Sequence, residues 1–103
     1  LSAHRVTRIV TAPSLARALT ELDDAQRLLA HLRWWFVSGE PLKRDVAARI
    51  RGVLPQTTLC NLYGSTETMS DVGCAIVGDD ALGGVLSIGK AIANCALLVL
   101  DER

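Results

Sequence analysis

The sequence has no excess of either charge, and this absence limits the partners that it could attract. Eleven lysines and arginines balance eleven aspartates and glutamates, and the basic residues are scattered along the chain. Nucleic acids and anionic lipids attract proteins through dense positive charge. We therefore expect neither nucleic acid nor a membrane surface among the partners.

Long apolar runs and paired cysteines are also missing. No run approaches the ~20 residues that a membrane-spanning helix needs, and no basic segment followed by an apolar one opens the sequence as a signal peptide would. The cysteines, Cys60, Cys74 and Cys95, form no Cys-x-x-Cys pair, so neither a disulfide framework nor a zinc site is expected. Each lies in an apolar run and is interpreted as a small buried thiol. The sequence thus predicts a protein of the reducing cytoplasm without membrane insertion.

Familiar catalytic patterns are missing as well. The dipeptide Gly89-Lys90 lacks the Walker spacing that wraps a phosphate, and no Ser/His/Asp or Cys/His nucleophile arrangement can be read from the sequence. His4 and His31 lie outside any group of polar residues and are interpreted as structural. Any catalytic role must therefore come from other side chains.

What the sequence does contain is an alternation of strand and helix patterns. Strands are predicted at 6–11, 33–37 and 57–62, the second of them buried on both faces, and helices at 15–22, 25–32 and 42–54. Ser14 is expected to cap the first helix, and Asp23 with Gln26 to form a capping box at the second. Two βα units in succession imply parallel strands joined by right-handed crossovers.

From residue 72 onward the pattern changes to strands joined by glycine-rich turns, predicted at 72–77, 84–88 and 96–100. We therefore expect an α/β fold of about two βα units, residues 1–71, followed by a β-rich extension, residues 72–103. The length is that of one small domain. The first residues have the character of a helix end, and the last follow directly on an apolar strand. We expect both ends to be cut from a longer protein.

The heptapeptide N-L-Y-G-S-T-E at residues 61–67 is the densest group of polar side chains. It follows a predicted strand, and α/β sheets normally bind ligands at the carboxyl ends of their strands. Tyr63 offers a flat face for a base, and Asn61 offers a donor and an acceptor for the edge of an adenine. The Thr66 hydroxyl can donate to phosphate, and the Glu67 carboxylate suits a hard cation such as Mg²⁺. The alternative is an ordinary turn with a core tyrosine and a surface glutamate.

Two further polar positions adjoin strands or this heptapeptide. Gly39 permits close approach of the backbone just after residues 33–37, and Glu40 beside it is a solvated or helix-start carboxylate in the simpler interpretation. Asp71 lies four residues after Glu67, so the two carboxylates would share a face of a helical turn. They could act on one metal, or Asp71 could face another ligand or solvent.

Four ordered segments resemble those of adenylate-forming enzymes, the superfamily of nonribosomal peptide synthetase adenylation domains and acyl-CoA synthetases. They are L-R-W-W-F-V-S-G-E-P-L at 32–42, N-L-Y-G-S-T-E at 61–67, I-G-K-A-I-A-N at 88–94 and V-L-D-E at 99–102. Residues 6–15 also match a strand-to-helix segment, so the resemblance covers essentially the whole chain. It implies part of the large N-terminal domain of an AMP-forming ligase. Such enzymes use Mg·ATP to convert a carboxylic or amino acid to an acyl-adenylate and pass the acyl group to CoA or to carrier-protein phosphopantetheine.

The resemblance also implies roles for individual residues. The nucleotide site would comprise Gly39, Glu40, Asn61, Tyr63, Gly64 and Thr66, with Thr66 and Glu67 as catalytic residues and Glu67 as the Mg²⁺ ligand. The acyl pocket would comprise Val10, Phe36, Ser38, Leu62, Ser70 and Asp71. Asn61 and Tyr63 would hold the adenine, and Thr66 would contact phosphate. The run Y-G-S-T-E followed by Asp71 is similar to forms that activate small amino acids such as β-alanine, in which Asp71 would pair with the substrate ammonium.

Several parts of such enzymes have no counterpart in these residues: the upstream phosphate loop, the upstream pocket acid, the downstream ribose-binding aspartate and the C-terminal catalytic lysine. Without that lysine, the charge that develops at the attacked phosphorus lacks its main stabiliser, so we expect the chain to be inactive alone. Two alternatives stay open. One is a fatty acyl- or aryl-CoA ligase, and the other is a non-catalytic α/β remnant that acts only as an interaction module.

Overall fold

A computed structural model describes residues 2–65, 71–78 and 86–101 of the chain. The described residues form a sheet in the order β1-β2-β3-β4-β5. Its strands are β1 (Arg8–Thr11), β2 (Trp34–Val37), β3 (Thr58–Gly64), β4 (Asp71–Ile76) and β5 (Lys90–Ala91). The helices are the 3-10 helix η1 (Ser2–His4), α1 (Pro13–Thr20), α2 (Ala25–Leu28) and α3 (Arg44–Val53). This is the mixed α/β fold that the sequence predicts.

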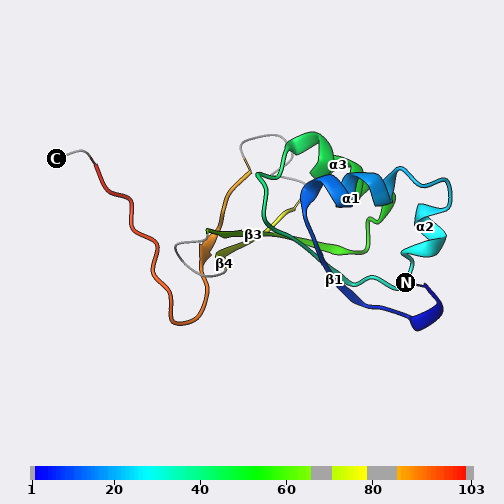
Figure 1. Ribbon diagram of the computed structural model, residues 1–103, viewed down its shortest axis with the longest axis horizontal. Helices are drawn as coiled ribbons and strands as arrows, with labels where there is room; N and C mark the ends of the chain where they lie inside the picture. The colour runs from blue at the N-terminus through cyan, green and yellow to red at the C-terminus, as the bar shows by residue number, and fades with distance from the viewer. Residues whose placement is uncertain (1, 66–70, 79–85, 102–103) are drawn as a thin grey trace.

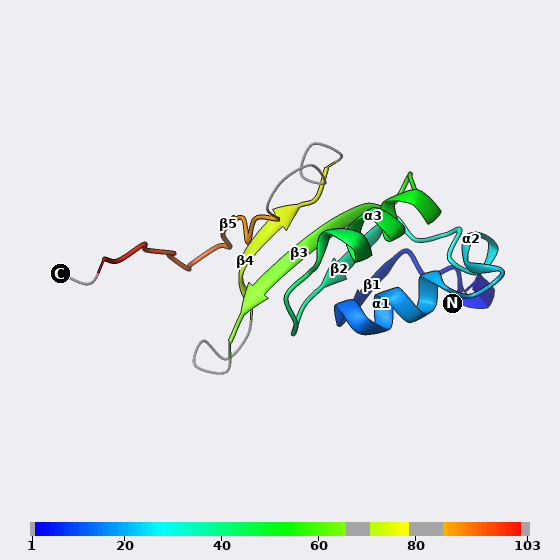
Figure 2. The same cartoon turned by 90° about the horizontal axis from the view of Figure 1, so that it is seen from above.

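The direction of the strands reverses at β4 and again at β5. β1, β2 and β3 run parallel, whereas β4 is antiparallel to β3 and β5 to β4. A parallel step needs a crossover; helices α1 and α2 make the first and α3 makes the second (Figure 2). The ends of β1, β2 and β3 therefore lie at one edge of the sheet, together with the start of β4. That edge carries the candidate site.

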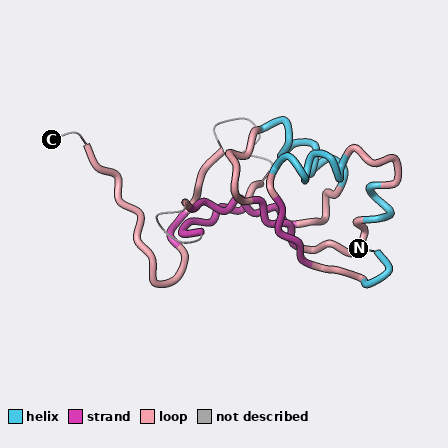
Figure 3. The backbone as a smooth tube through the Cα atoms, viewed as in Figure 1, coloured by secondary structure: helices cyan, strands magenta, loops and turns pink. Residues whose placement is uncertain are grey.

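Helices α1 and α3 lie side by side over one face of the sheet (Figures 1 and 3). The core forms between them and that face, where Trp35, Val37 and Leu59 of the strands and Ile50 of α3 are fully buried. Burying each large apolar side chain contributes about 1.5–3 kcal/mol. The indole Nε1 of Trp35 donates a 2.9 Å hydrogen bond to Thr11 Oγ1, so the polar atom of the largest core residue is also satisfied.

The opposite face of the sheet carries no α-helix in the described part of the chain. We call it the helix-free face; strand alternation and register give it the side chains of Arg8, Val10, Trp34, Phe36, Cys60, Leu62, Cys74 and Ile76. Trp34 and Phe36 are only half-buried, with their rings stacked at 6.0 Å. The prediction that residues 33–37 are buried on both faces is therefore wrong, because one layer of helices covers one face alone.

The predicted cap of the first helix is also wrong. α1 begins two residues early, with Ala12 at the N-cap position and Pro13 in the first turn. Proline fits there because its fixed φ is already helical and it has no N–H to satisfy. Ser14 therefore lies inside the helix, and its hydroxyl donates a 2.8 Å hydrogen bond to Glu40 Oε1 instead.

The second helix is shorter than its apolar pattern predicts. α2 has four residues, its N-cap is Asp24, and that residue makes no side-chain capping bond. The capping box expected from Asp23 and Gln26 is thus wrong. Asp24 instead pairs with Arg27 at 3.1 Å, an exposed contact of the i,i+3 type that contributes little to stability.

The β-rich part agrees with the sequence at one of its three predicted strands. The strand expected at 72–77 is confirmed as β4. Of the strand expected at 84–88, residues 84 and 85 lie outside the described residues, and 86–88 are not in a strand. The expected strand at 96–100 is wrong, since this run extends away from the sheet (Figure 1) with Leu98 and Val99 exposed. A strand needs hydrogen-bonding partners outside itself, and the described residues offer this run none.

No helix in the described ranges is long and apolar enough to cross a membrane.

Candidate active site

A cavity of about 350 Å³ opens at the edge of the sheet where β2 and β3 end. Its lining comprises Gly39, Glu40, Pro41, Leu42, Asn61, Leu62, Tyr63, Gly64, Leu86 and Ile88. Five of the six residues predicted for the nucleotide site are in this lining: Gly39, Glu40, Asn61, Tyr63 and Gly64. The remaining one, Thr66, lies outside the described residues, as do Glu67 and Ser70. Residues that are more than twenty positions apart in the sequence thus share one cavity.

Asn61 and Tyr63 lie two positions apart on β3, so both side chains project to the same side of the strand. Asn61 is 7% exposed, and its Nδ2 donates a 3.0 Å hydrogen bond to the carbonyl of Ser87. This bond uses one of the donors of the amide and fixes its orientation. Tyr63 is 44% exposed, so its ring is available to a ligand in the cavity.

The loop after β2 supplies the other wall of the cavity. Gly39 has a φ of +89°, and an added Cβ would meet no atom within 4 Å. Glycine is therefore favoured here by the backbone conformation rather than by lack of space. Beside it, Glu40 accepts the hydrogen bond from Ser14, which ties this loop to the first turn of α1.

The described residues among those predicted for the acyl pocket gather on the helix-free face. Val10 is the register partner of Phe36, and alternation puts Leu62 on the same face as both. Val10 is 64% exposed. At the strand ends the surface becomes polar. Ser38 and Asp71 lie there, and the Ser38 hydroxyl is 2.5 Å from Asp71 Oδ1. The arrangement offers an apolar surface that ends in a hydrogen-bonded carboxylate.

The two predicted sets meet along β3. Asn61 and Tyr63 project to the side of the sheet that carries the helices, and Leu62 between them projects to the helix-free face. Leu62 also borders the cavity. The strand thus separates a polar and aromatic surface from an apolar one, which suits a base on one side and an acyl chain on the other.

Two thiols beside the acyl residues were not predicted as part of the site. Cys60 is the register partner of Phe36, and Cys74 is that of Leu62. Burial raises the pKa of the Cys60 thiol to about 11, and the neighbouring Cys74 adds to this effect. The expectation of buried thiols holds for Cys60, whereas Cys74 is half-buried and Cys95 is exposed. Only pairing across strands, which spacing does not reveal, brings the first two together.

The segment at 86–89 is a further part of the site. The sequence motifs did not predict it, because Gly89-Lys90 lacks the spacing of a phosphate-binding loop. Leu86 and Ile88 line the cavity, and Gly89 turns the chain along β4 with a φ of +79°. A Cβ on Gly89 would lie 1.9 Å from the carbonyl oxygen of Cys74. Gly89 of the Gly-Lys dipeptide therefore has a structural role, which is to bring this segment against the sheet.

Comparison with known proteins gives consistent results. The family model described as "AMP-binding enzyme" matches residues 1–103. The 4-coumarate–CoA ligase-like 6 protein of rice (Oryza sativa subsp. japonica) is 31% identical over 99 residues, which cover 95% of this chain. The β-alanyl-bioamine nonribosomal peptide synthetase ebony of Drosophila melanogaster is 31% identical over 112 residues, covering 98% of the chain. Among solved structures, holo-PA1221, a nonribosomal peptide synthetase (NRPS) protein containing adenylation and peptidyl carrier protein (PCP) domains, superposes with a TM-score of 0.87 at 33% identity over 98% of the chain.

The chain spans only a small part of each of these proteins. It covers 16% of the rice protein, 13% of the Drosophila protein and 17% of the PA1221 chain. What it shares with them is therefore one segment, and that segment includes the candidate site.

Proposed function

Because the chain belongs to the AMP-binding enzyme family, within the adenylate-forming superfamily, we propose that it supplies the adenine-binding wall and part of the acyl pocket of an ATP-dependent ligase. The observation that carries this proposal is the single cavity of about 350 Å³ that collects Gly39, Glu40, Asn61, Tyr63 and Gly64. The ligase would join a carboxylic acid to AMP and release pyrophosphate.

The residues of the cavity fit a nucleotide. The exposed ring of Tyr63 offers a stacking face for adenine, a contact worth about 1–3 kcal/mol. The buried amide of Asn61, fixed by Ser87, presents its remaining polar atoms to the edge of the base. Gly39, in the same lining, leaves open space, because an added Cβ would meet no atom within 4 Å. Thr66 would contact phosphate, and Glu67 would hold the Mg²⁺ that neutralises charge on the phosphates.

In the proposed reaction, a carboxylate oxygen of the acid attacks the α-phosphorus of ATP, and the bond to pyrophosphate breaks. The acyl-adenylate then loses AMP when a thiol attacks its carbonyl carbon. The role of this chain is positional: Phe36 and Leu62 contact the acyl chain, and β3 holds the adenine on its other face. Fixing both reactants on one strand reduces the entropy lost in bringing them together.

We propose that the acid carries an ammonium group. Asp71 lies at the end of the apolar row formed by Val10, Phe36 and Leu62, and a carboxylate next to apolar groups is stabilised by an opposite charge. The Drosophila relative, a β-alanyl-bioamine synthetase, supports a small amino acid such as β-alanine. The rice relative is a CoA ligase-like protein of equal identity, so a fatty acyl- or aryl-CoA ligase is the second candidate. Asp71 counts against it, because an uncharged acyl group would leave this carboxylate without a cationic partner.

The acceptor thiol is proposed to be a carrier-protein phosphopantetheine. PA1221 contains adenylation and PCP domains in one protein, which supports a carrier domain as partner. CoA is the corresponding acceptor in the second candidate. The free cysteines of the described residues and the use of ATP both favour the reducing cytoplasm.

A chimaera tests the proposal. Residues 1–103 replace the matched segment of PA1221, and ATP–pyrophosphate exchange is measured with a panel of acids that includes β-alanine and propionate. We expect exchange with an amino acid and loss of exchange in the Glu67→Ala variant. A folded chimaera without exchange for any acid would favour the non-catalytic interaction module, and preference for an acid without an amine would favour the CoA ligase.

A further inference from the structure

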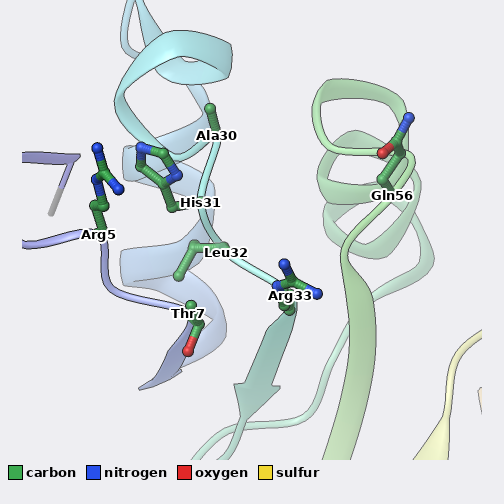
Figure 4. A pocket seen from close by; sticks show the side chains of 7 residues that line it. All are labelled: Arg5, Thr7, Ala30, His31, Leu32, Arg33 and Gln56. Carbon is green, nitrogen blue, oxygen red and sulfur yellow. The ribbon is translucent and has the colours of Figure 1, made fainter.

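A second cavity, of about 500 Å³, lies at the opposite edge of the sheet, where the parallel strands begin. Figure 4 shows the side chains that line it: Arg5, Thr7, Ala30, His31, Leu32, Arg33 and Gln56. They include two arginines, a histidine and a glutamine, and no carboxylate. β3 begins beside this cavity and ends at the candidate active site. The 7 residues of β3 span roughly 20 Å, so the two cavities are separate.

The backbone around this cavity is held by the sheet. Arg33 N donates a 2.8 Å hydrogen bond to Thr7 O, and Arg33 O accepts one of 2.8 Å from Thr58 N. The hydroxyl of Thr57 donates to the carbonyl of Leu32 at 2.8 Å, and the Leu32 side chain is 4% exposed. The base of the cavity is thus apolar and fixed by three hydrogen bonds, and the polar side chains stand around it.

The positive charges of the lining are not used within the described part of the chain. The two ion pairs there join residues within or next to α1 and α2, and neither includes Arg5, Arg33 or His31. Basic residues at this edge could simply complement the carboxyl end of α3. However, the basic residue in the last turn of that helix is Arg51, whose guanidinium donates to Thr57 O at 3.3 Å. The arginines of the cavity come from other segments.

Arg5 also has an unusual backbone. Its φ is +50°, and Asn94 is the other non-glycine residue with a positive φ among those described. Residues with a long side chain rarely adopt this backbone conformation. Where it occurs, the surrounding structure holds it in place, and such residues are concentrated at ligand-binding and catalytic sites. The turn brings the guanidinium of Arg5 beside the imidazole of His31 (Figure 4). The strain thus coincides with the meeting of two of the donors, whereas Arg33 and Gln56 lie on the other side of Leu32 in this view.

We propose that this cavity binds a phosphorylated small molecule, with Arg5 and His31 as the donors to its phosphate group and Arg33 and Gln56 as donors to other polar groups of the same molecule. The planar guanidinium fork matches the oxygens of a phosphate, which it can bind through two parallel hydrogen bonds. A volume of about 500 Å³ is in the usual range for pockets of whole metabolites. The phosphate therefore belongs to a larger molecule, such as a nucleotide or a phosphorylated sugar.

Residue-resolved amide NMR of the 103-residue chain tests this site. The chain is titrated with inorganic phosphate, glucose 6-phosphate and AMP, at constant ionic strength set by chloride. We expect saturable shifts at the amides of Thr7, Arg33 and Gln56, and tighter binding of the two organic phosphates than of phosphate itself. Equal affinity for all three would assign the site to free phosphate instead. Shifts that merely follow total ionic strength would overturn the proposal.

The variants Arg5→Gln and Arg33→Gln are each expected to weaken binding about tenfold, the usual effect of removing a hydrogen bond to a charged group. Arg49→Gln is the matched control, since Arg49 is an exposed arginine of α3 outside the lining. This variant should bind the phosphate ligands with the affinity of the wild type. Gln56→Glu adds a carboxylate at an exposed position and should weaken binding without affecting the core. Unchanged affinity in Gln56→Glu, or equal losses in all three arginine variants, would refute the site.

The result is independent of the proposed ligase function. AMP bound in the candidate active site would shift the amides of Asn61 and Gly64, whereas phosphate bound at the second cavity would shift those near Arg33. Either set of shifts can occur without the other.

Discussion

The hydroxyl of Ser38 donates a 2.5 Å hydrogen bond to Oδ1 of Asp71, although the two residues are 33 positions apart. The bond joins the end of β2 to the start of β4 across the end of β3. It orients one carboxylate oxygen toward Ser38 and directs the other away from it. If Asp71 recognises an ammonium group, Ser38 is the residue that positions it.

Asp71→Asn should remove the preference for amino acids. In the PA1221 chimaera, kcat/KM for β-alanine should fall by about tenfold or more, the usual loss for a hydrogen bond to a charged group, while that for propionate should not fall. Ser38→Ala should raise KM for β-alanine with a smaller effect on kcat. The exchange assay measures both, and a parallel loss for the two acids in Asp71→Asn would argue against ammonium recognition.

Tyr63→Ala should weaken AMP binding to the 103-residue chain. Loss of a stacked ring costs about 1–3 kcal/mol, which corresponds to roughly a 5- to 150-fold rise in Kd. Tyr63→Phe is the control, because it keeps the ring and should bind AMP almost as well as the wild type. Calorimetric titration gives both values, and equal affinity in Tyr63→Ala and the wild type would remove the ring from the site.

Thr11→Val should destabilise the fold by about 1–3 kcal/mol, because it leaves the buried indole N–H of Trp35 without its acceptor. Thr58→Val is a matched control at a half-buried strand position and should change the free energy of unfolding by much less. Urea denaturation measures the difference. Equal stability of the two variants would mean that the hydrogen bond between Trp35 and Thr11 makes no net contribution to the free energy of unfolding.

Gly89→Ala should separate the segment at 86–91 from β4. The new Cβ would overlap the carbonyl of Cys74, and the backbone has a positive φ, so the chain must move. Gly52→Ala, in α3 with nothing within 4 Å of the added Cβ, should instead stabilise the protein by about 0.5–1 kcal/mol. Thermal unfolding compares the two, and loss of AMP binding in Gly89→Ala would show that the Ser87 contact with Asn61 supports the nucleotide site.

The thiols should react in order of their exposure. The pKa of Cys60 is raised to about 11 by burial and by Cys74, so at pH 8 almost none of it is thiolate, the reactive form. Exposed Cys95 should be alkylated first and Cys60 last, as mass spectrometry after timed iodoacetamide treatment would show. Faster labelling of Cys60 than of Cys95 in the folded chain would contradict this order.

The same shift predicts how stability depends on pH. Folding favours the protonated thiol of Cys60, so its contribution is fully present below the ordinary thiol pKa of about 9.0 and is lost as the pH rises from there to about 11. The melting temperature of the wild type should fall more steeply over this interval than that of Cys60→Ser. Identical profiles would mean that the Cys60 thiol does not titrate in this range.

The sequence predicts those features that depend on local periodicity. The parallel order of β1, β2 and β3 follows from two βα units, and the cavity at their ends follows from where the polar heptapeptide lies. Other features were missed, whether a distant or a neighbouring residue decides them. The run 96–100 has strand character, but no described neighbour pairs with it. Ser14 has the chemistry of a cap, but Pro13 starts the helix one residue before it. The bond between Ser38 and Asp71 depends on β4 returning beside β3, which no spacing reveals.

The alternation of side chains along β3 has a consequence for how such a ligase could diversify. Asn61 and Tyr63 project to one side of the strand, and Leu62 projects to the other. Under the proposed function, we expect a point mutation at Val10 or Phe36, which lie on the helix-free face outside the lining of the cavity, to alter the choice of acid while the contacts with the nucleotide persist. An insertion of one residue in the strand would exchange the two sides and disrupt both. If β3 has the proposed role, new acid specificities would be accessible through single substitutions on one face of the sheet.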